Sequence, residues 1–136
     1  MPASALTFAL MDAPYESART ATAFRLIDLA LRRGLNVNVF AYEGAVGLTF
    51  ARQAQHPNAT HGRSVAEEDH PLPHAWVAAL QQFAQARGVL LDWVNCGLCL
   101  DERGVGEAIP GVRRGAPADF FRLARESVNT LVIPTR

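Results

Sequence analysis

The sequence predicts an α/β protein in which a five-stranded parallel sheet lies between two layers of helices. Short apolar runs of strand length alternate along the chain with longer stretches that repeat apolar residues at helical spacing. The first strand, helix and second strand are joined by short connections, which favour a right-handed βαβ unit with parallel strands. With 136 residues the chain is long enough to bury its own core, and we expect one domain over residues 1–136.

The first βαβ unit has the clearest pattern. Residues 6–11 form an apolar run that predicts a buried strand, and residues 35–41 predict a second strand in which valines alternate with asparagines. Between them we expect a long helix with Ser17 as its N-cap and Gly34 just past its end. The apolar positions of this helix have helical spacing and should face the core: Ala23, Phe24, Ile27, Ala30 and Leu31.

A long polar stretch, residues 42–73, then interrupts the alternation. It holds three of the four histidines and an acidic cluster at residues 67–69, and only residues 45–51 suggest a short helix. A connection of this length is more often functional or mobile than merely connecting. We therefore expect it to form a wall or lid beside a site.

The alternation resumes with a helix over residues 73–87 that ends at Gly88, and a strand over residues 89–95. The inner face of this helix should carry Trp76, Leu80, Phe83 and Ala84. A weaker strand is expected over residues 107–112, where Pro110 indicates an edge position. A third helix opens at residues 116–119, and a last strand covers residues 130–133. The core-facing residues expected after that opening are Phe120, Leu123, Ala124 and Ser127.

Both cysteines of the chain lie in residues 90–104. Asn95, Cys96 and Gly97 follow the third strand as a turn, residues 98–103 can form one or two helical turns, and Gly104 ends them. A cysteine at such a turn lies near unpaired backbone N–H groups and the positive end of a helix dipole, which favour the nucleophilic thiolate. Cys99 follows at i+3, so both sulfurs should share one face.

The carboxyl ends of parallel strands meet at one edge of the sheet, where ligand sites form. Besides Cys96, this edge should bring together Asp12, Tyr15, Tyr42 and Glu43. Asp12 could equally be a turn residue, and Tyr42 could serve packing alone. Trp76 and Trp93 are expected in the core or at a subunit interface, and Arg113 and Arg114 at an interface or in solvent.

The composition excludes several function classes. The 13 basic residues are all arginine and balance 13 acidic residues, so no catalytic lysine is possible and nothing favours binding to nucleic acid or an anionic membrane. No apolar run is long enough to span a bilayer, and the first residues lack the basic region of a signal peptide. We therefore expect a cytoplasmic protein with reduced, reactive thiols.

The run Cys96-x-x-Cys99-x-x-x-Arg103-Gly104 after the third strand resembles the DsrE/DsrF-like (TusD-like) family of sulfur-relay proteins. Supporting similarities are Ala13-Pro14-Tyr15, the aromatic strand and acidic-Gly-x-Val turn in residues 39–46, and residues 109–112. The resemblance implies strand order 4-3-2-1-5 and assembly into trimers, hexamers or hetero-oligomers with sister subunits. It also implies that Cys96 takes a sulfane sulfur from a donor protein as a persulfide and passes it to an acceptor protein's thiol.

We assign the catalytic role to Cys96, with Cys99 as a helper thiol or a packing residue, and we expect no cofactor. The remaining candidates should bind substrate or form the wall of the site: Asp12, Tyr15, Tyr42, Glu43, Asn95, Gly97 and Arg103. Arg103 could fix the turn, pair with a carboxylate or hold an anionic sulfur donor.

Four other interpretations stay open. Cys96 and Cys99 could form a dithiol–disulfide redox pair, although no opposing cis-proline strand is evident. His70-x-x-x-His74 and the cysteines could bind zinc, although the histidine-bearing stretch looks irregular. The thiols could also be incidental in a non-catalytic oligomeric or small-ligand-binding module, and Cys96 could simply be a buried apolar residue.

Overall fold

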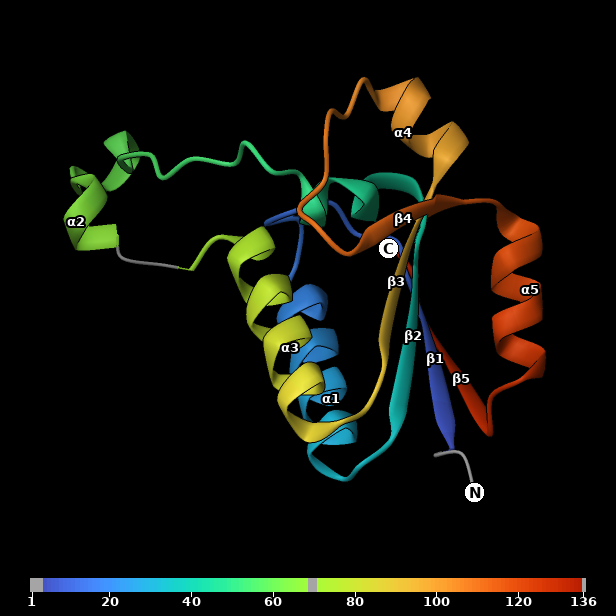
Figure 1. Ribbon diagram of the computed structural model, residues 1–136. Coiled ribbons are helices and arrows are strands. Elements are labelled where there is room, and N and C mark those ends of the chain that lie inside the picture. Colours follow the sequence, from blue (N-terminus) through green and yellow to red (C-terminus); the bar gives the residue numbers. More distant parts are fainter. Residues whose placement is uncertain (1–3, 69–70, 136) are drawn as a thin grey trace.

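The computed structural model of the chain describes residues 4–68 and 71–135. Its centre is a five-stranded parallel sheet with strand order β4-β3-β2-β1-β5 (Figure 1). This confirms the predicted fold class and the order 4-3-2-1-5. The strands are β1 (Ala5–Leu10), β2 (Asn36–Ala41), β3 (Leu91–Cys96), β4 (Val112–Gly115) and β5 (Asn129–Ile133).

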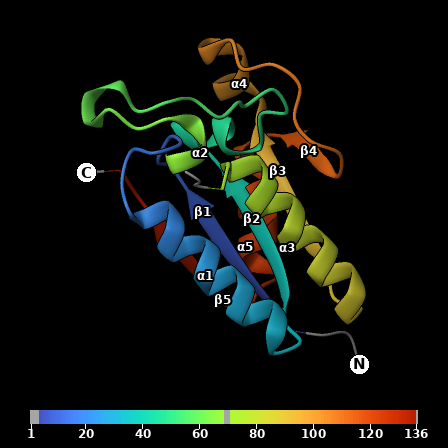
Figure 2. The same cartoon turned by 90° about the vertical axis from the view of Figure 1, so that its left-hand side faces the viewer.

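Helices cover both faces of this sheet. Helices α1 (Arg19–Arg32) and α3 (Pro73–Arg87) lie side by side on one face, and α5 (Pro117–Arg125) lies on the other (Figures 1 and 2). The short helix α4 (Gly97–Arg103) stands above the carboxyl ends of the strands. The stretch between β2 and α3 contains η1 (Glu43–Thr49), η2 (Ala59–His61) and α2 (Val65–Glu68). Within residues 4–68 and 71–135, no helix is long and apolar enough to cross a membrane.

Helix α1 buries the five apolar residues that its spacing predicted, and Gly34 follows it with a left-handed φ of 79°. The backbone N–H groups of Gly34 and Leu35 bond back to the carbonyls of Leu31 and Ala30, which closes the last turn. The N-terminus differs by one residue, since Ala18 is the N-cap. Ser17 still accepts a hydrogen bond from the N–H of Arg19 (3.1 Å) through its hydroxyl.

The sheet separates two apolar cores of unequal size. The larger core lies beneath α1 and α3, where Phe24 makes edge contacts with Trp76 and Trp93 at ring-centroid distances of 4.9 and 6.1 Å. The smaller core lies on the side of α5. Its buried members are Phe40, Val46, Val94, Cys96, Cys99 and Leu123.

The fourth strand is where the sequence prediction was wrong. Residues 107–112 were expected to form it, but Pro110 and Gly111 form a turn and β4 begins at Val112. Only Ala108 forms an isolated bridge, with Phe50. Proline lacks the N–H that a strand needs, and Gly111 has a φ of 87°, so the chain turns before it can pair. The two arginines after Val112 therefore lie within the edge strand.

The other differences concern which side chains are fully covered. In α3 the buried residues are Pro73, Val77, Leu80 and Ala84, whereas Trp76 and Phe83 are only half-buried because they lie at the border of the inner face. In α5 only Leu123 is buried; Phe120 and Ala124 are half-buried, and Ser127 follows the end of the helix. The short helix expected at residues 45–51 is the 3₁₀ helix η1, at residues 43–49.

Candidate functional site

The two thiols lie together at the carboxyl edge of the sheet. Cys96 is the last residue of β3 and the N-cap of α4, and Cys99 follows in the first turn of that helix. Both cysteines are free, and their side chains are hydrogen-bonded to each other, so the two sulfurs share one face as the i+3 spacing predicted. Their exposed fractions are only 2% and 5%, so neither sulfur is open to solvent.

The surroundings of Cys99 keep it protonated. Burial raises the pKa of the Cys99 thiol, and its hydrogen bond to Cys96 raises it further, to about 11. The backbone N–H of Glu43 donates to the Cys99 sulfur at 3.3 Å. This bond lowers the pKa of Cys99, but the net shift is still upward. At neutral pH Cys99 is therefore a neutral thiol whose S–H can be donated to the sulfur of Cys96.

A tight turn at residues 42–44, where η1 begins directly after β2, covers Cys99. Glu43 has a left-handed φ of 53°, unusual for a residue with a side chain, and its carboxylate pairs with Arg103 of α4 at 2.7 Å. Gly44 lies so close to Ala13 that a Cβ at position 44 would come within 2.8 Å of the Ala13 Cβ. The turn is therefore held from two sides, and Arg103 acts here by pairing with a carboxylate, one of its three predicted roles.

Tyr42 is at the start of the same turn and stacks on Phe40, with ring centroids 6.2 Å apart. The negative charge of Glu43 is the largest of the causes that raise the pKa of the Tyr42 phenol. Tyr42, Glu43 and Arg103 line a cavity of about 380 Å³ at the carboxyl ends of β1 and β2. Neither thiol lines it, so the turn separates the cavity from the cysteines.

Asp12 and Tyr15, two further predicted residues, lie apart from the thiols. The buried carboxylate of Asp12 accepts a hydrogen bond from the Ser17 hydroxyl, which fits the turn role left open for it. Tyr15 is 60% exposed and lines a different cavity, of about 130 Å³, together with Phe24 and Trp76. The structure thus groups Tyr42, Glu43 and Arg103 with the cysteines and leaves Asp12 and Tyr15 outside this group.

Asn95 and Gly97 flank Cys96 and have different surroundings. The Asn95 side chain is buried and donates from its Nδ2 to the Thr49 hydroxyl at 2.9 Å, while its Oδ1 has no hydrogen-bond partner among the described residues. Gly97 lies against the guanidinium of Arg114, where an added Cβ would come within 2.5 Å of Nε. A Cβ at position 97 would push the Arg114 side chain aside.

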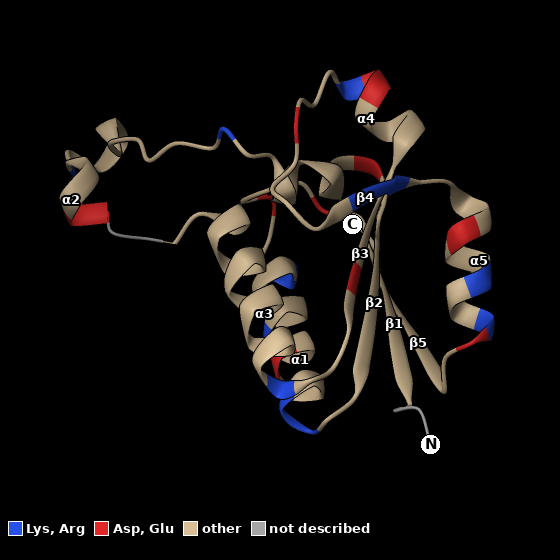
Figure 3. Cartoon of the chain, viewed as in Figure 1, with Lys and Arg blue, Asp and Glu red and all other residues tan. Residues whose placement is uncertain are grey.

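Arg114 is the residue near the cysteines that sequence reasoning did not assign to the site. Figure 3 shows the basic strip that Arg113 and Arg114 form along β4. Arg114 reaches α4 and binds both carboxylate oxygens of Asp101, at 3.0 and 2.6 Å. Side chains alternate between the two faces of a strand, and this alternation could have indicated on which side of the sheet Arg114 lies. Using it required the correct boundary of β4.

The long stretch after β2 forms a wall only at its beginning. Helix η1 packs against α4. Residues 52–68 instead extend away from the sheet and are mostly exposed (Figure 1). Within the part of the chain that the structure describes, no group of three or more His, Cys, Asp or Glu residues could hold a metal ion. His70, which the zinc interpretation requires, lies outside the described residues.

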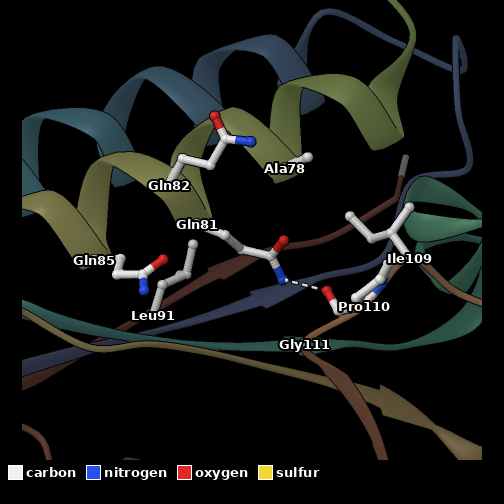
Figure 4. Close-up of a pocket in the computed structure, with 8 residues that line it drawn as sticks. All are labelled: Ala78, Gln81, Gln82, Gln85, Leu91, Ile109, Pro110 and Gly111. Carbon is white, nitrogen blue, oxygen red and sulfur yellow. Dashed lines mark hydrogen bonds between the residues drawn. The ribbon is translucent and has the colours of Figure 1, made fainter.

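A further cavity, of about 510 Å³, is not at this edge. It lies between α3 and the turn before β4, and Figure 4 shows Gln81, Gln82 and Gln85 along one side, with Gln81 donating to the carbonyl of Pro110 at 3.1 Å. Its lining contains amides and apolar groups but no ionisable or nucleophilic side chain. The chemistry of the described residues therefore points to the cysteine edge.

Comparisons with known proteins agree with this architecture. The sequence profile of the DsrE/DsrF-like family matches residues 4–133. The fold is similar to the crystal structure of the YchN protein from E. coli, with a TM-score of 0.70, 20% identity, and coverage of 97% of this chain and 99% of that one. It is also similar to BT1422, a conserved protein of unknown function from Bacteroides thetaiotaomicron, with a TM-score of 0.55, 14% identity, and coverage of 96% and 95%. No curated protein sequence matches the chain.

Proposed function

Because the chain belongs to the DsrE/DsrF-like family, we propose that it is a sulfur carrier that holds a sulfane sulfur as a persulfide on Cys96. The observation that carries the proposal is the placement of two buried, free thiols side by side at the carboxyl edge of the sheet. Burial and the hydrogen bond to Cys96 raise the pKa of Cys99 to about 11, so Cys99 keeps its proton. Cys96 is then the nucleophile of the pair, and Cys99 is a hydrogen-bond donor to it.

The proposed transfer is a thiol–persulfide exchange without net oxidation. The thiolate of Cys96 attacks the outer sulfur of a donor persulfide, R–S–SH; a bond forms between Sγ and that sulfur, and the donor S–S bond breaks. Its electron pair leaves with the donor as R–S⁻. An acceptor thiolate then attacks the outer sulfur on Cys96, and Cys96 is released as the thiolate, ready for the next cycle.

Burial of Cys96 makes movement a requirement of this exchange. A residue that is 2% exposed cannot meet a donor sulfur in line unless its cover opens. The turn at Tyr42–Gly44 is the cover that the site offers, since Glu43 binds Cys99 through its N–H and Arg103 through its carboxylate. We place the opening there, where one exposed ion pair and one N–H···S contact must be broken.

Partners and assembly form part of the same proposal. A carrier needs a donor protein and an acceptor protein, each presenting a thiol or persulfide, and a reducing cytoplasm would keep its own thiols free. Family membership supports assembly into a trimer, a hexamer or a hetero-oligomer with sister subunits. Light scattering on the purified chain tests the homo-oligomer, and a monomeric mass would leave only assembly with other chains.

Intact-mass measurement tests the proposed chemistry. Reduced protein incubated with a low-molecular-weight persulfide should gain one sulfur atom, and a second thiol added afterwards should remove it. Cys96→Ser should abolish the gain, whereas the matched variant Cys99→Ser should still load. A wild-type protein that gains no sulfur, or a Cys96→Ser protein that loads as well as wild type, would contradict the proposal.

A dithiol–disulfide function is the second candidate, and the hydrogen bond between the two thiols is the observation that favours it. Oxidation would form a disulfide between the two cysteines and break the hydrogen bond from the Glu43 N–H to the Cys99 sulfur. Equilibration with glutathione redox buffers separates the two functions. A pair that cycles reversibly between dithiol and disulfide without loading sulfur would favour the redox function over the carrier.

A further inference from the structure

Arg114 lies on β4, which pairs with the end of β3 that carries Cys96. In the pairing of β3 with β4, Arg114 is opposite Asn95, and Gly115 is opposite Cys96. The guanidinium extends over Gly97, because a Cβ placed on Gly97 would lie 2.5 Å from Nε, 2.8 Å from Cζ and 2.9 Å from Nη2. The positive charge therefore packs against the residue that directly follows the candidate carrier cysteine.

Asp101 fixes the guanidinium in this place. Both of its carboxylate oxygens accept hydrogen bonds from Arg114, at 3.0 and 2.6 Å, and such bidentate pairs hold direction as well as charge. Since Asp101 belongs to α4, the contact also ties the edge strand to the helix that carries Cys99. Arg113, the preceding residue, instead binds Asp92 on β3 through two hydrogen bonds of 2.9 Å.

We propose that Arg114 is a positioning residue for the sulfur chemistry of this edge, with its Asp101-held guanidinium favouring an anionic sulfur on Cys96. This inference deepens the proposed function and rests on it for its biological meaning. Both the thiolate before loading and the ionised persulfide after loading carry a negative charge that a nearby fixed cation stabilises. The hydrogen bonds and the charge of Asp101 are the main causes that raise the pKa of Arg114, and the charge on Cys96 adds to them.

The other charged groups around Cys96 do not supply this charge. Arg103 is paired with Glu43 at 2.7 Å, and Arg113 is engaged by Asp92, with Asp119 of α5 4.0 Å away. The remaining titratable groups near the cysteine are neutral thiol or phenol, or acidic. The titratable and charged groups on the elements beside Cys96 include Tyr42 and Glu43 from the turn, Cys99, Asp101, Glu102 and Arg103 from α4, Arg113 and Arg114 from β4, and Asp119 from α5.

The test is the pH dependence of the Cys96 thiol in the full-length protein, with Cys99→Ala as the common background. Thiolate absorbance in the ultraviolet and the rate of iodoacetamide alkylation are both followed against pH. Removing the cation with Arg114→Gln should move the midpoint to higher pH by about half a unit, a modest shift because the side chain is partly exposed and partly neutralised by Asp101. Gly97→Ala, whose new Cβ displaces the guanidinium, should shift the midpoint in the same direction.

Arg113→Gln is the matched control, because it removes the same charge one residue earlier in the strand, and it should leave the midpoint unchanged. Arg114→Lys should keep most of the effect. An unchanged midpoint in Arg114→Gln, or an equal shift in Arg113→Gln, would overturn the proposal. Circular dichroism establishes that each variant is folded, and the titration contains no sulfur donor, so failure of persulfide loading would contradict the proposed function without altering this result.

Discussion

Cys99 lies three residues after Cys96, with its sulfur against the N–H of Glu43 and in contact with the other thiol. Its exposed fraction is only 5%, and burial is the largest cause of its raised pKa. Because thiolates are the reactive form of cysteine, the two sulfurs should differ in reactivity although they are three residues apart. The local environment, and not the sequence motif, sets this order.

A labelling experiment can measure the order. With a pKa of about 11, only about one Cys99 thiol in a thousand is ionised at pH 8, so limiting iodoacetamide should modify Cys96 before Cys99. Peptide mapping by mass spectrometry identifies the modified residue. In urea the environment of Cys99 is lost, and both thiols should react at similar rates. Preferential labelling of Cys99 in the native protein would contradict this assignment.

The sequence predicted the cysteine edge but not all of its contacts. Strand and turn patterns were enough to bring Cys96, Cys99, Tyr42 and Glu43 to one end of the sheet, because parallel strands share their carboxyl edge. Arg114 could not be placed in the same way. Its contact with Gly97 depends on where the edge strand begins and on which carboxylate Arg114 pairs with. Both are set by tertiary packing and not by the local sequence.

At the scale of elements, the pair formed by Glu43 and Arg103 ties the turn after β2 to the end of α4. The two side chains are 44% and 36% exposed, so the pair contributes little to global stability. Its position matters more, since the same turn covers Cys99 through the N–H of Glu43. We therefore expect the ion pair to affect a local opening of the turn more than the stability of the fold.

Removing this tie should separate the two effects. Arg103→Gln should lower the free energy of unfolding by less than about 1 kcal/mol but raise the rate of thiol labelling in the native protein several-fold. Urea denaturation measures the first quantity and labelling kinetics the second. Arg122→Gln breaks a comparable exposed pair with Glu126 on α5 and should affect neither strongly. Equal labelling rates in the two variants would show that the turn is not the cover.

Element boundaries were predictable where local signals agreed. The apolar spacing of α1, Gly34 after it, and Gly104 after α4 are local features, and all three have the predicted roles, with Gly104 at a left-handed φ of 61°. Residues 107–112 carried conflicting signals, an apolar run containing Pro110. Pairing with β3 decided the outcome, because Trp93 aligns with Val112 and not with an earlier residue.

At the scale of the whole molecule, the sheet divides the interior so that both thiols belong to the smaller core. The larger core, between the sheet and helices α1 and α3, holds Trp93 and the longer apolar helix faces. The smaller core is covered by α5, in which only Leu123 is buried, together with α4 and η1, which contribute Cys99 and Val46.

This division predicts different consequences for two equivalent core substitutions. Leu123 in the smaller core and Leu80 in the larger core are both 3% exposed, so Leu123→Ala and Leu80→Ala should each lower the free energy of unfolding by about 2–5 kcal/mol. Urea denaturation provides this comparison. Because a cavity next to Cys96 and Cys99 loosens their surroundings, thiol labelling under native conditions should accelerate more in Leu123→Ala than its loss of global stability accounts for. In Leu80→Ala, the labelling rate should follow global stability alone. If the two variants label at the same rate at matched stability, the thiols become exposed only when the whole molecule unfolds, and the prediction is wrong.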